Sequence, residues 1–155
     1  MKLLPLRWRC VKKAGHAYGL SESGQENKMV KRIHSENVRV KRAYEPASQS
    51  DGTRVLIDRL WPRGVKKTDA KVDEWMKDIA PSTELRKWFG HDPARWPEFR
   101  DRYAAEIKQH PEQLQHLRAL ASEGPLTLVF SAHDEEHNNA IVVRDLLLGQ
   151  HARHA

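Results

Sequence analysis

The sequence of 155 residues has little cysteine and no long apolar run. Its one cysteine, Cys10, lies near the amino terminus, so the chain has no disulfide and the rest of it has no cysteine nucleophile. We therefore expect a cytoplasmic protein, because disulfide-free chains are typical of reducing compartments. No apolar run approaches the roughly 18 residues that a membrane-spanning helix requires. Residues 3–6 are too few for the apolar region of a signal peptide, so we expect no membrane contact.

Acidic charge is scarce only at the start of the chain. The net charge is +6, and residues 1–28 hold six Lys or Arg and two Glu, which leaves +2 for the rest. A nearly neutral body gives little support to nucleic-acid binding. Residues 1–28 also show no periodicity, so we predict that they are disordered. A basic arm that binds nucleic acid is the alternative for this segment.

Three segments have the composition of β-strands. Residues 38–42 alternate apolar and basic side chains, which is typical of a half-exposed strand, whereas residues 54–60 and 126–130 contain apolar runs typical of buried strands. The two buried strands are separated by helical segments, and such a crossover favours parallel pairing. We therefore predict a small three-layer α/β domain over residues 29–150, with a mostly parallel sheet and helices on both faces. Residues 151–155 are predicted to be a tail.

Helical spacing of apolar residues fills the region between the two buried strands. Proline and glycine mark several of the boundaries, and Ser82 has the position expected of an N-cap. The predicted helices lie at 68–79, between Ser82 and Gly90, along a face carrying Phe99 to Ile107, from Pro111 to Gly124, and at 140–148.

Three motifs resemble one known family. The segments 54–64, 80–91 and 128–140 are similar to signatures of the YeaO-like branch of domain-of-unknown-function family 488 (DUF488), and the match runs from about Val38 to Leu148. The resemblance implies a small α/β domain and no established reaction. Members of this kind commonly begin close to Met29, so residues 1–28 are expected to be a disordered or mis-assigned extension.

Charged and aromatic residues follow the first buried strand directly. Arg59 and Arg63 carry forked guanidinium groups, which bind carboxylate or phosphate through two hydrogen bonds. The alternative is that Asp58 pairs with one of them and only holds the loop. Trp61 either packs in the core or stacks on a bound base. Gly64 belongs to the same motif, and all five residues are candidates for a ligand site at the end of the strand.

The last predicted helix opens with Asn138 and Asn139. Free backbone N–H groups and side-chain amides at a helix start form an anion site, although both residues could instead be plain caps. Together with Arg59 and Arg63, they lead to our main hypothesis. We expect a pocket at the carboxyl ends of the buried strands that binds an anionic, phosphate-bearing small molecule.

Candidate acid–base residues also occur near these strand ends. They are Asp58, Asp134 and His137, and whether the protein is an enzyme stays open. Residues 133–137 spell H-x-x-E-H, a zinc-hydrolase motif, but the motif needs a helix through both histidines and His133 follows a strand directly. We therefore expect neither a metal nor another cofactor.

Two further functions remain as alternatives. A nucleic-acid interaction module would use Arg39, Lys41 and Arg42 together with the basic first segment. A partner-binding domain would need no pocket. The sequence does not predict the oligomeric state.

Overall fold

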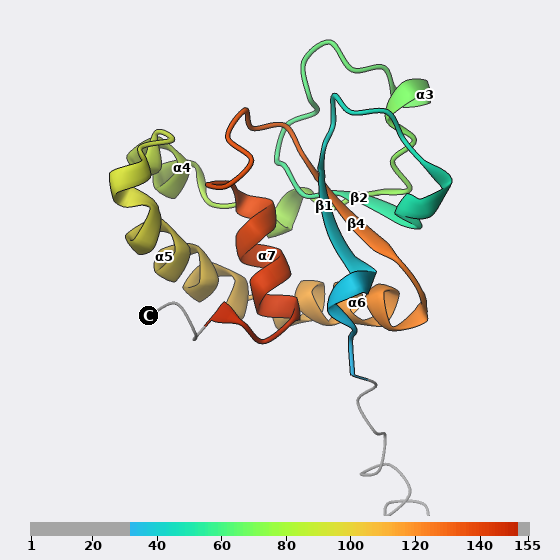
Figure 1. The fold of residues 1–155 in the computed structure, drawn as a ribbon. Helices are drawn as coiled ribbons and strands as arrows, with labels where there is room; N and C mark the ends of the chain where they lie inside the picture. The colour runs from blue at the N-terminus through green and yellow to red at the C-terminus, as the bar shows by residue number, and fades with distance from the viewer. Residues whose placement is uncertain (1–31, 152–155) are drawn as a thin grey trace, which may run out of the picture. The chain divides into compact units, whose positions relative to one another are not determined.

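The computed structural model describes residues 32–151, so the predictions for residues 1–28 and 152–155 lie outside the described residues. Within this range, four parallel strands form one sheet in the order β1-β4-β2-β3 (Figure 1). The central pair is β2 and β4, with Val55 opposite Leu128, which confirms the predicted parallel pairing of the two buried strands. The strands are β1 (Val38–Arg42), β2 (Thr53–Leu56), β3 (Glu74–Trp75) and β4 (Leu126–Phe130).

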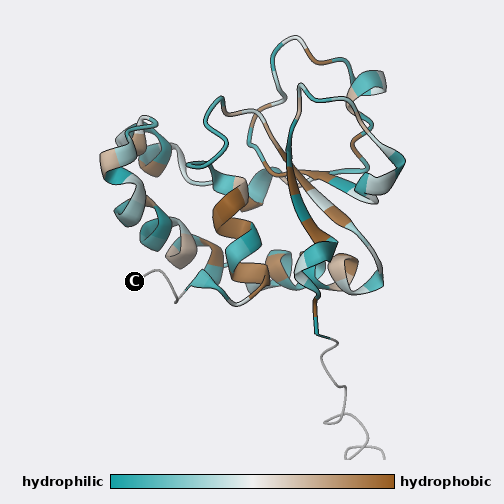
Figure 2. Ribbon diagram, in the orientation of Figure 1, coloured by the Kyte–Doolittle hydropathy of each residue, from teal (hydrophilic) through white to brown (hydrophobic). Residues whose placement is uncertain are grey.

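Four helices and the main hydrophobic core lie on one side of the sheet. Val55 and Ile57 point into this core, as does Leu128, because alternate residues of a strand face the same side. Helix α7 contacts both β1 and β4, and much of its ribbon has the brown colour of hydrophobic residues in Figure 2. No helix among residues 32–151 is long and apolar enough to cross a membrane. The helices on this face are α4 (Thr83–Phe89), α5 (Trp96–Lys108), α6 (Pro111–Glu123) and α7 (Asn139–Leu147).

The other face of the sheet has a thinner cover. A second, smaller apolar cluster is centred on Leu56 and Val129, and Trp61 and Trp75 pack against it. The one-turn helix α3 (Lys67–Ala70) belongs to the chain segment that covers this face. The predicted α/β class with a parallel sheet is thus confirmed. Short 3-10 turns complete the fold at η1 (Ser35–Asn37), η2 (Gln49–Asp51), η3 (Lys77–Ile79) and η4 (Pro93–Arg95).

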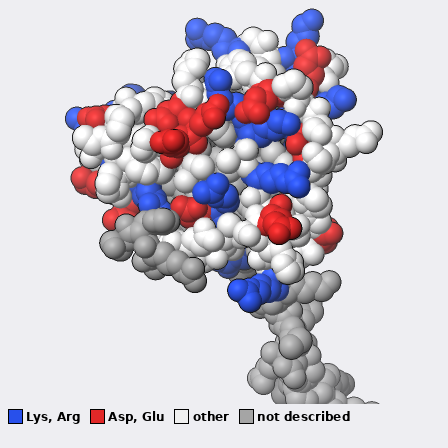
Figure 3. Space-filling model, in the orientation of Figure 1, with Lys and Arg blue, Asp and Glu red and all other residues white. Residues whose placement is uncertain are grey.

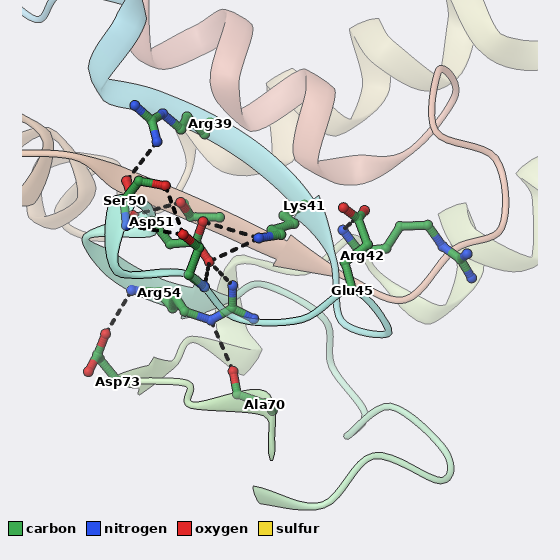
Figure 4. Close-up of polar contacts among 11 residues, drawn as sticks. Arg39, Lys41, Arg42, Glu45, Ser50, Asp51, Arg54, Ala70 and Asp73 are labelled. Atoms are coloured by element: carbon green, nitrogen blue, oxygen red, sulfur yellow. Dashed lines mark hydrogen bonds and ion pairs between the residues drawn. The ribbon is translucent and has the colours of Figure 1, made fainter. Parts of the chain in front are cut away.

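A buried polar network occupies part of this second face (Figure 4). The Asp51 carboxylate accepts hydrogen bonds from Arg54 Nη1 at 2.6 Å and Lys41 Nζ at 3.2 Å. Arg54 Nε donates to the Ala70 carbonyl oxygen at 2.9 Å, which ties α3 to β2. Burial raises the pKa of Asp51, but hydrogen bonds from the Ser48 N–H, Lys41 and Arg54 outweigh it and hold the pKa below its usual value.

The predicted helix at 68–79 is wrong beyond its first turn. Lys71 adopts a left-handed conformation with φ of 46° and ends α3, and Glu74–Trp75 then form strand β3 beside β2. The carbonyl oxygens of Arg54 and Leu56 accept hydrogen bonds from this segment, each at 2.9 Å. Without β3, these buried carbonyl groups of β2 would lack hydrogen-bond partners. The free-energy cost of leaving them unpaired outweighs the preference for a helix that the spacing of the apolar side chains indicates.

Candidate functional site

The loops that follow β1, β2 and β4 meet at the carboxyl edge of the sheet (Figure 1). The predicted strand at 54–60 ends early, because Ile57 makes the last ladder hydrogen bond, to Val129, at 3.1 Å. The chain then turns away at Asp58. A cavity of about 410 Å³ lies beside these loops and α4. Its walls comprise Tyr44, 58–63, Ala80, Pro81, Arg86, Phe89, His91, Phe99, Ser131, Ala132, Asn138 and Asn139.

Asp58 joins three elements at the cavity wall. Its carboxylate accepts hydrogen bonds from Ser131 N at 2.8 Å, from Ser131 Oγ at 2.5 Å and from Asn139 Nδ2 at 2.9 Å. These contacts connect the end of β2 to the end of β4 and to the first residue of α7. Among the described residues, Asp58 makes no ion pair with Arg59 or Arg63. Asp58 therefore holds the strand ends together, and its partners are not the arginines that the alternative considered.

The side-chain amides of the two asparagines are engaged by the protein itself. Asn138 is the buried N-cap of α7, accepting from Ile141 N at 3.2 Å, and its NH₂ group donates to two carbonyl oxygens of the preceding turn. Asn139 Nδ2 donates to Ile57 O at 3.3 Å as well as to Asp58. The NH₂ groups of both side chains therefore stabilise the cavity wall through hydrogen bonds within the protein.

Positive charge gathers at the exposed part of the cavity wall. Arg59, Arg63 and Arg86 are exposed, as is His91, and all four line the cavity. None of the three guanidinium groups has a hydrogen-bond acceptor or a carboxylate partner within residues 32–151. The one carboxylate on the described wall belongs to Asp58, whose oxygens already accept three hydrogen bonds. The described wall therefore carries three arginines against one carboxylate.

The loop that carries two of these arginines is held in shape by Trp61. Its indole Nε1 donates to Val65 O at 2.7 Å, and its ring packs edge-on against Trp75 at a centroid distance of 5.4 Å. Gly64 has φ of 80°, in the turn closed by the hydrogen bond from Val65 N to Pro62 O. A residue with a Cβ is strained there. Gly64 does not line the cavity, so its contribution is the path of the loop.

Three polar or charged cavity residues were missed from the sequence, together with most of the apolar wall. Tyr44 follows β1, donates its hydroxyl to Arg63 O at 3.1 Å, and lies under the guanidinium of Arg42 at 5.1 Å. Arg86 and His91 come from α4 and the turn after it. Both residues belong to segment 80–91, the second motif of the family resemblance, and that motif was the sequence feature that could have identified them as site residues. Tyr44 could have been inferred as the residue just past a third parallel strand.

Asp134 and His137 lie outside the described cavity wall. His137 donates its backbone N–H to Asp134 Oδ1 at 2.9 Å, and its ring Nδ1 lies 2.8 Å from Asp134 Oδ2. Hydrogen bonds from the backbone N–H and the ring of His137 hold the pKa of Asp134 below its usual value. Within residues 32–151, no three His, Cys, Asp or Glu side chains, those of His133 and His137 included, are grouped to hold a metal ion.

The basic residues of the nucleic-acid hypothesis have structural partners. Arg39 Nη1 donates to Ser50 O at 2.6 Å and Lys41 pairs with Asp51 (Figure 4). Arg42 Nε donates to the Ala132 carbonyl oxygen at 2.9 Å. Acidic and basic side chains are intermixed on the face of the molecule that Figure 3 shows. These three residues therefore do not form a free basic strip.

The fold and the site define a small parallel α/β domain with an arginine-lined cavity at the carboxyl edge of its sheet. The chain belongs to the DUF488 family, because the model described as the inactive DUF488-N3 subclade matches residues 37–155. The chain is 50% identical over 111 residues to the uncharacterised protein YeaO of Escherichia coli, a match that covers 72% of this chain and 96% of YeaO. It is 41% identical over 118 residues to an uncharacterised protein of Mycobacterium tuberculosis, covering 76% and 99% of the two chains. No solved structure matches significantly.

Proposed function

We propose that this protein binds a small anionic, phosphate-bearing molecule in the cavity at the carboxyl edge of its sheet. The observation that supports the proposal is the charge balance of the wall. Arg59, Arg63 and Arg86 have no acceptor among residues 32–151, whereas the Asp58 carboxylate is already hydrogen-bonded. Guanidinium groups on one cavity wall repel one another, so an anion in the cavity would reduce that repulsion and gain charged hydrogen bonds.

The size and location of the cavity also support a small ligand. Its volume of about 410 Å³ falls in the range of roughly 300–1,000 Å³ that is common for small-molecule sites. Ligands of open parallel sheets bind outside the carboxyl ends of the strands, where this cavity lies. The cytoplasm remains the compartment that we propose.

Binding without catalysis is the form of the proposal that we favour. A general base needs an oxygen or nitrogen free to take a proton from the ligand. The acid–base candidates predicted from the sequence do not meet this need well, because Asp58 already accepts three hydrogen bonds from Ser131 and Asn139, and the pair Asp134–His137 is not part of the described cavity wall. His91 is the remaining ring on the described wall that could take a proton. The family description, which names the subclade inactive, agrees with this form.

The proposal is tested by titrating phosphate and sulfate into the purified protein at fixed ionic strength, with calorimetry and thermal shift as readouts. We expect Arg63→Gln and Arg86→Gln each to weaken binding by roughly 10- to 100-fold, since a charged hydrogen bond contributes about 1.5–3 kcal/mol. Arg118→Gln is the matched control, because Arg118 is an exposed arginine on α6, which contributes no residue to the described cavity wall.

Absence of binding by the wild-type protein, or equal losses in all three variants, would overturn the proposal. Salt dependence separates it from the nucleic-acid alternative. A protein that contacts many phosphates loses affinity steeply as salt rises, whereas a site for one small anion loses much less.

A further inference from the structure

The cavity changes character from its mouth to its floor. The cationic side chains at the mouth, those of Arg59, Arg63 and Arg86, are exposed. The floor is buried and apolar, formed in part by Phe89 at 3% exposure and Phe99 at 2% exposure. The wall therefore combines exposed charge with a buried apolar part, and Leu60 and Tyr44 add further apolar surface at exposed positions.

The side-chain donors of the deep wall are already engaged by the protein. The N–H and hydroxyl of Ser131 both donate to Asp58, and the amide NH₂ groups of Asn138 and Asn139 donate to other protein oxygens. An oxyanion placed on the floor would find none of these side-chain donors free to replace its hydration, which is unfavourable. The exposed arginines therefore favour a position of the ligand's charge at the mouth, and the buried floor favours an apolar group.

Aromatic side chains form part of the floor. The rings of Phe89 and Phe99 stack with their centroids 4.2 Å apart and an interplanar angle of 23°. Pro81 and Ala80, both buried, complete this part of the wall. An aromatic ring gains apolar burial there together with the offset or edge contacts that aromatic pairs prefer.

We infer that the ligand class is an anion with an aromatic body, such as an aryl phosphate. In this arrangement the arginines at the mouth hold the phosphate and the ring lies on the floor beside Phe89 and Phe99. This inference rests on the proposed function, because it describes the uncharged part of the same anionic ligand.

The test compares methyl phosphate with phenyl phosphate, which share their charge and their hydrogen-bonding oxygens and differ in the apolar body. We expect phenyl phosphate to bind the wild-type protein at least about tenfold more tightly, as burial of a ring predicts. Benzyl alcohol supplies the ring without the charge and should bind more weakly than phenyl phosphate. Arg86→Gln should weaken both phosphates by the same factor, so their affinity ratio stays unchanged. Phe89→Leu should lower the ratio.

The outcomes are distinguishable. Equal affinity for the two phosphates would contradict the inference of an aromatic group and would leave the proposed anion site unaffected. No binding of either phosphate would overturn both. Benzyl alcohol that binds as tightly as phenyl phosphate would show that the arginines contribute nothing, which contradicts the proposed function. The ligand series uses the wild-type protein, so the test does not depend on whether the Phe89 variant folds.

Discussion

Replacing Asp58 by asparagine should destabilise the protein, because its carboxylate joins β2, β4 and α7. Asparagine has nearly the same shape but only one oxygen. That oxygen can still accept from Ser131 N and Oγ, which lie 2.8 and 2.5 Å from Asp58 Oδ2 in the wild-type protein. The new NH₂ group then faces Asn139 Nδ2, which now donates to Asp58 Oδ1 at 2.9 Å, so two donors oppose each other.

The magnitude follows from counting what is lost. One charged hydrogen bond, worth about 1.5–3 kcal/mol, disappears, and two more become neutral and weaker. Rotation of the Asn139 amide does not rescue the site, because its oxygen would then face the Ile57 carbonyl oxygen, which now accepts from Asn139 Nδ2. Asp58 is half-buried, which reduces the loss, and we expect a fall in unfolding free energy of about 2–3 kcal/mol.

Urea unfolding at neutral pH measures this change, with Asp78→Asn as the matched control. Asp78 is exposed and has no hydrogen-bond or ion-pair partner within residues 32–151, so its variant should change stability by less than about 0.5 kcal/mol. If Asp58→Asn is as stable as this control, the carboxylate is a free group and the structural role argued for it is refuted.

Arg63→Gln should lower the unfolding free energy by well under 1 kcal/mol, because the exposed guanidinium has no partner within residues 32–151. A larger loss in urea unfolding would mean that the Arg63 side chain stabilises the fold. The depressed pKa of Asp51 means that its contribution to stability is present at pH values above the unfolded pKa of about 3.9 and is lost as pH falls through the lower folded value. Urea unfolding across the acid range should therefore show a shallower loss for Asp51→Asn than for wild type, from a lower starting stability. Gly52→Ala should lower the melting temperature sharply, since a Cβ there would lie 2.1 Å from Pro125 O and Gly52 has φ of 64°. Gly124→Ala, with nothing within 4 Å, is its control, and equal effects of the two variants would contradict the argument.

Local signals in the sequence determined much of the fold. The apolar runs that became β2 and β4 were evident, and the helix boundaries at Ser82 and Asn138 follow from side chains that cap backbone N–H groups nearby in the chain. The position of the cavity beside the strand ends could be anticipated as well, because parallel strands bring their carboxyl ends to one edge.

The tertiary structure decided what depends on partners far away in the chain. Glu74–Trp75 became a strand because β2 presented unpaired backbone groups, a need that no window around residue 74 reveals. Asp58 connects the ends of β2 and β4 because Ser131, 73 positions further on, donates two hydrogen bonds to its carboxylate. Arg86 reached the cavity because α4 lies beside the strand ends. Propensity and capping act over a few residues, whereas these hydrogen bonds and charges find their partners only once the chain has folded.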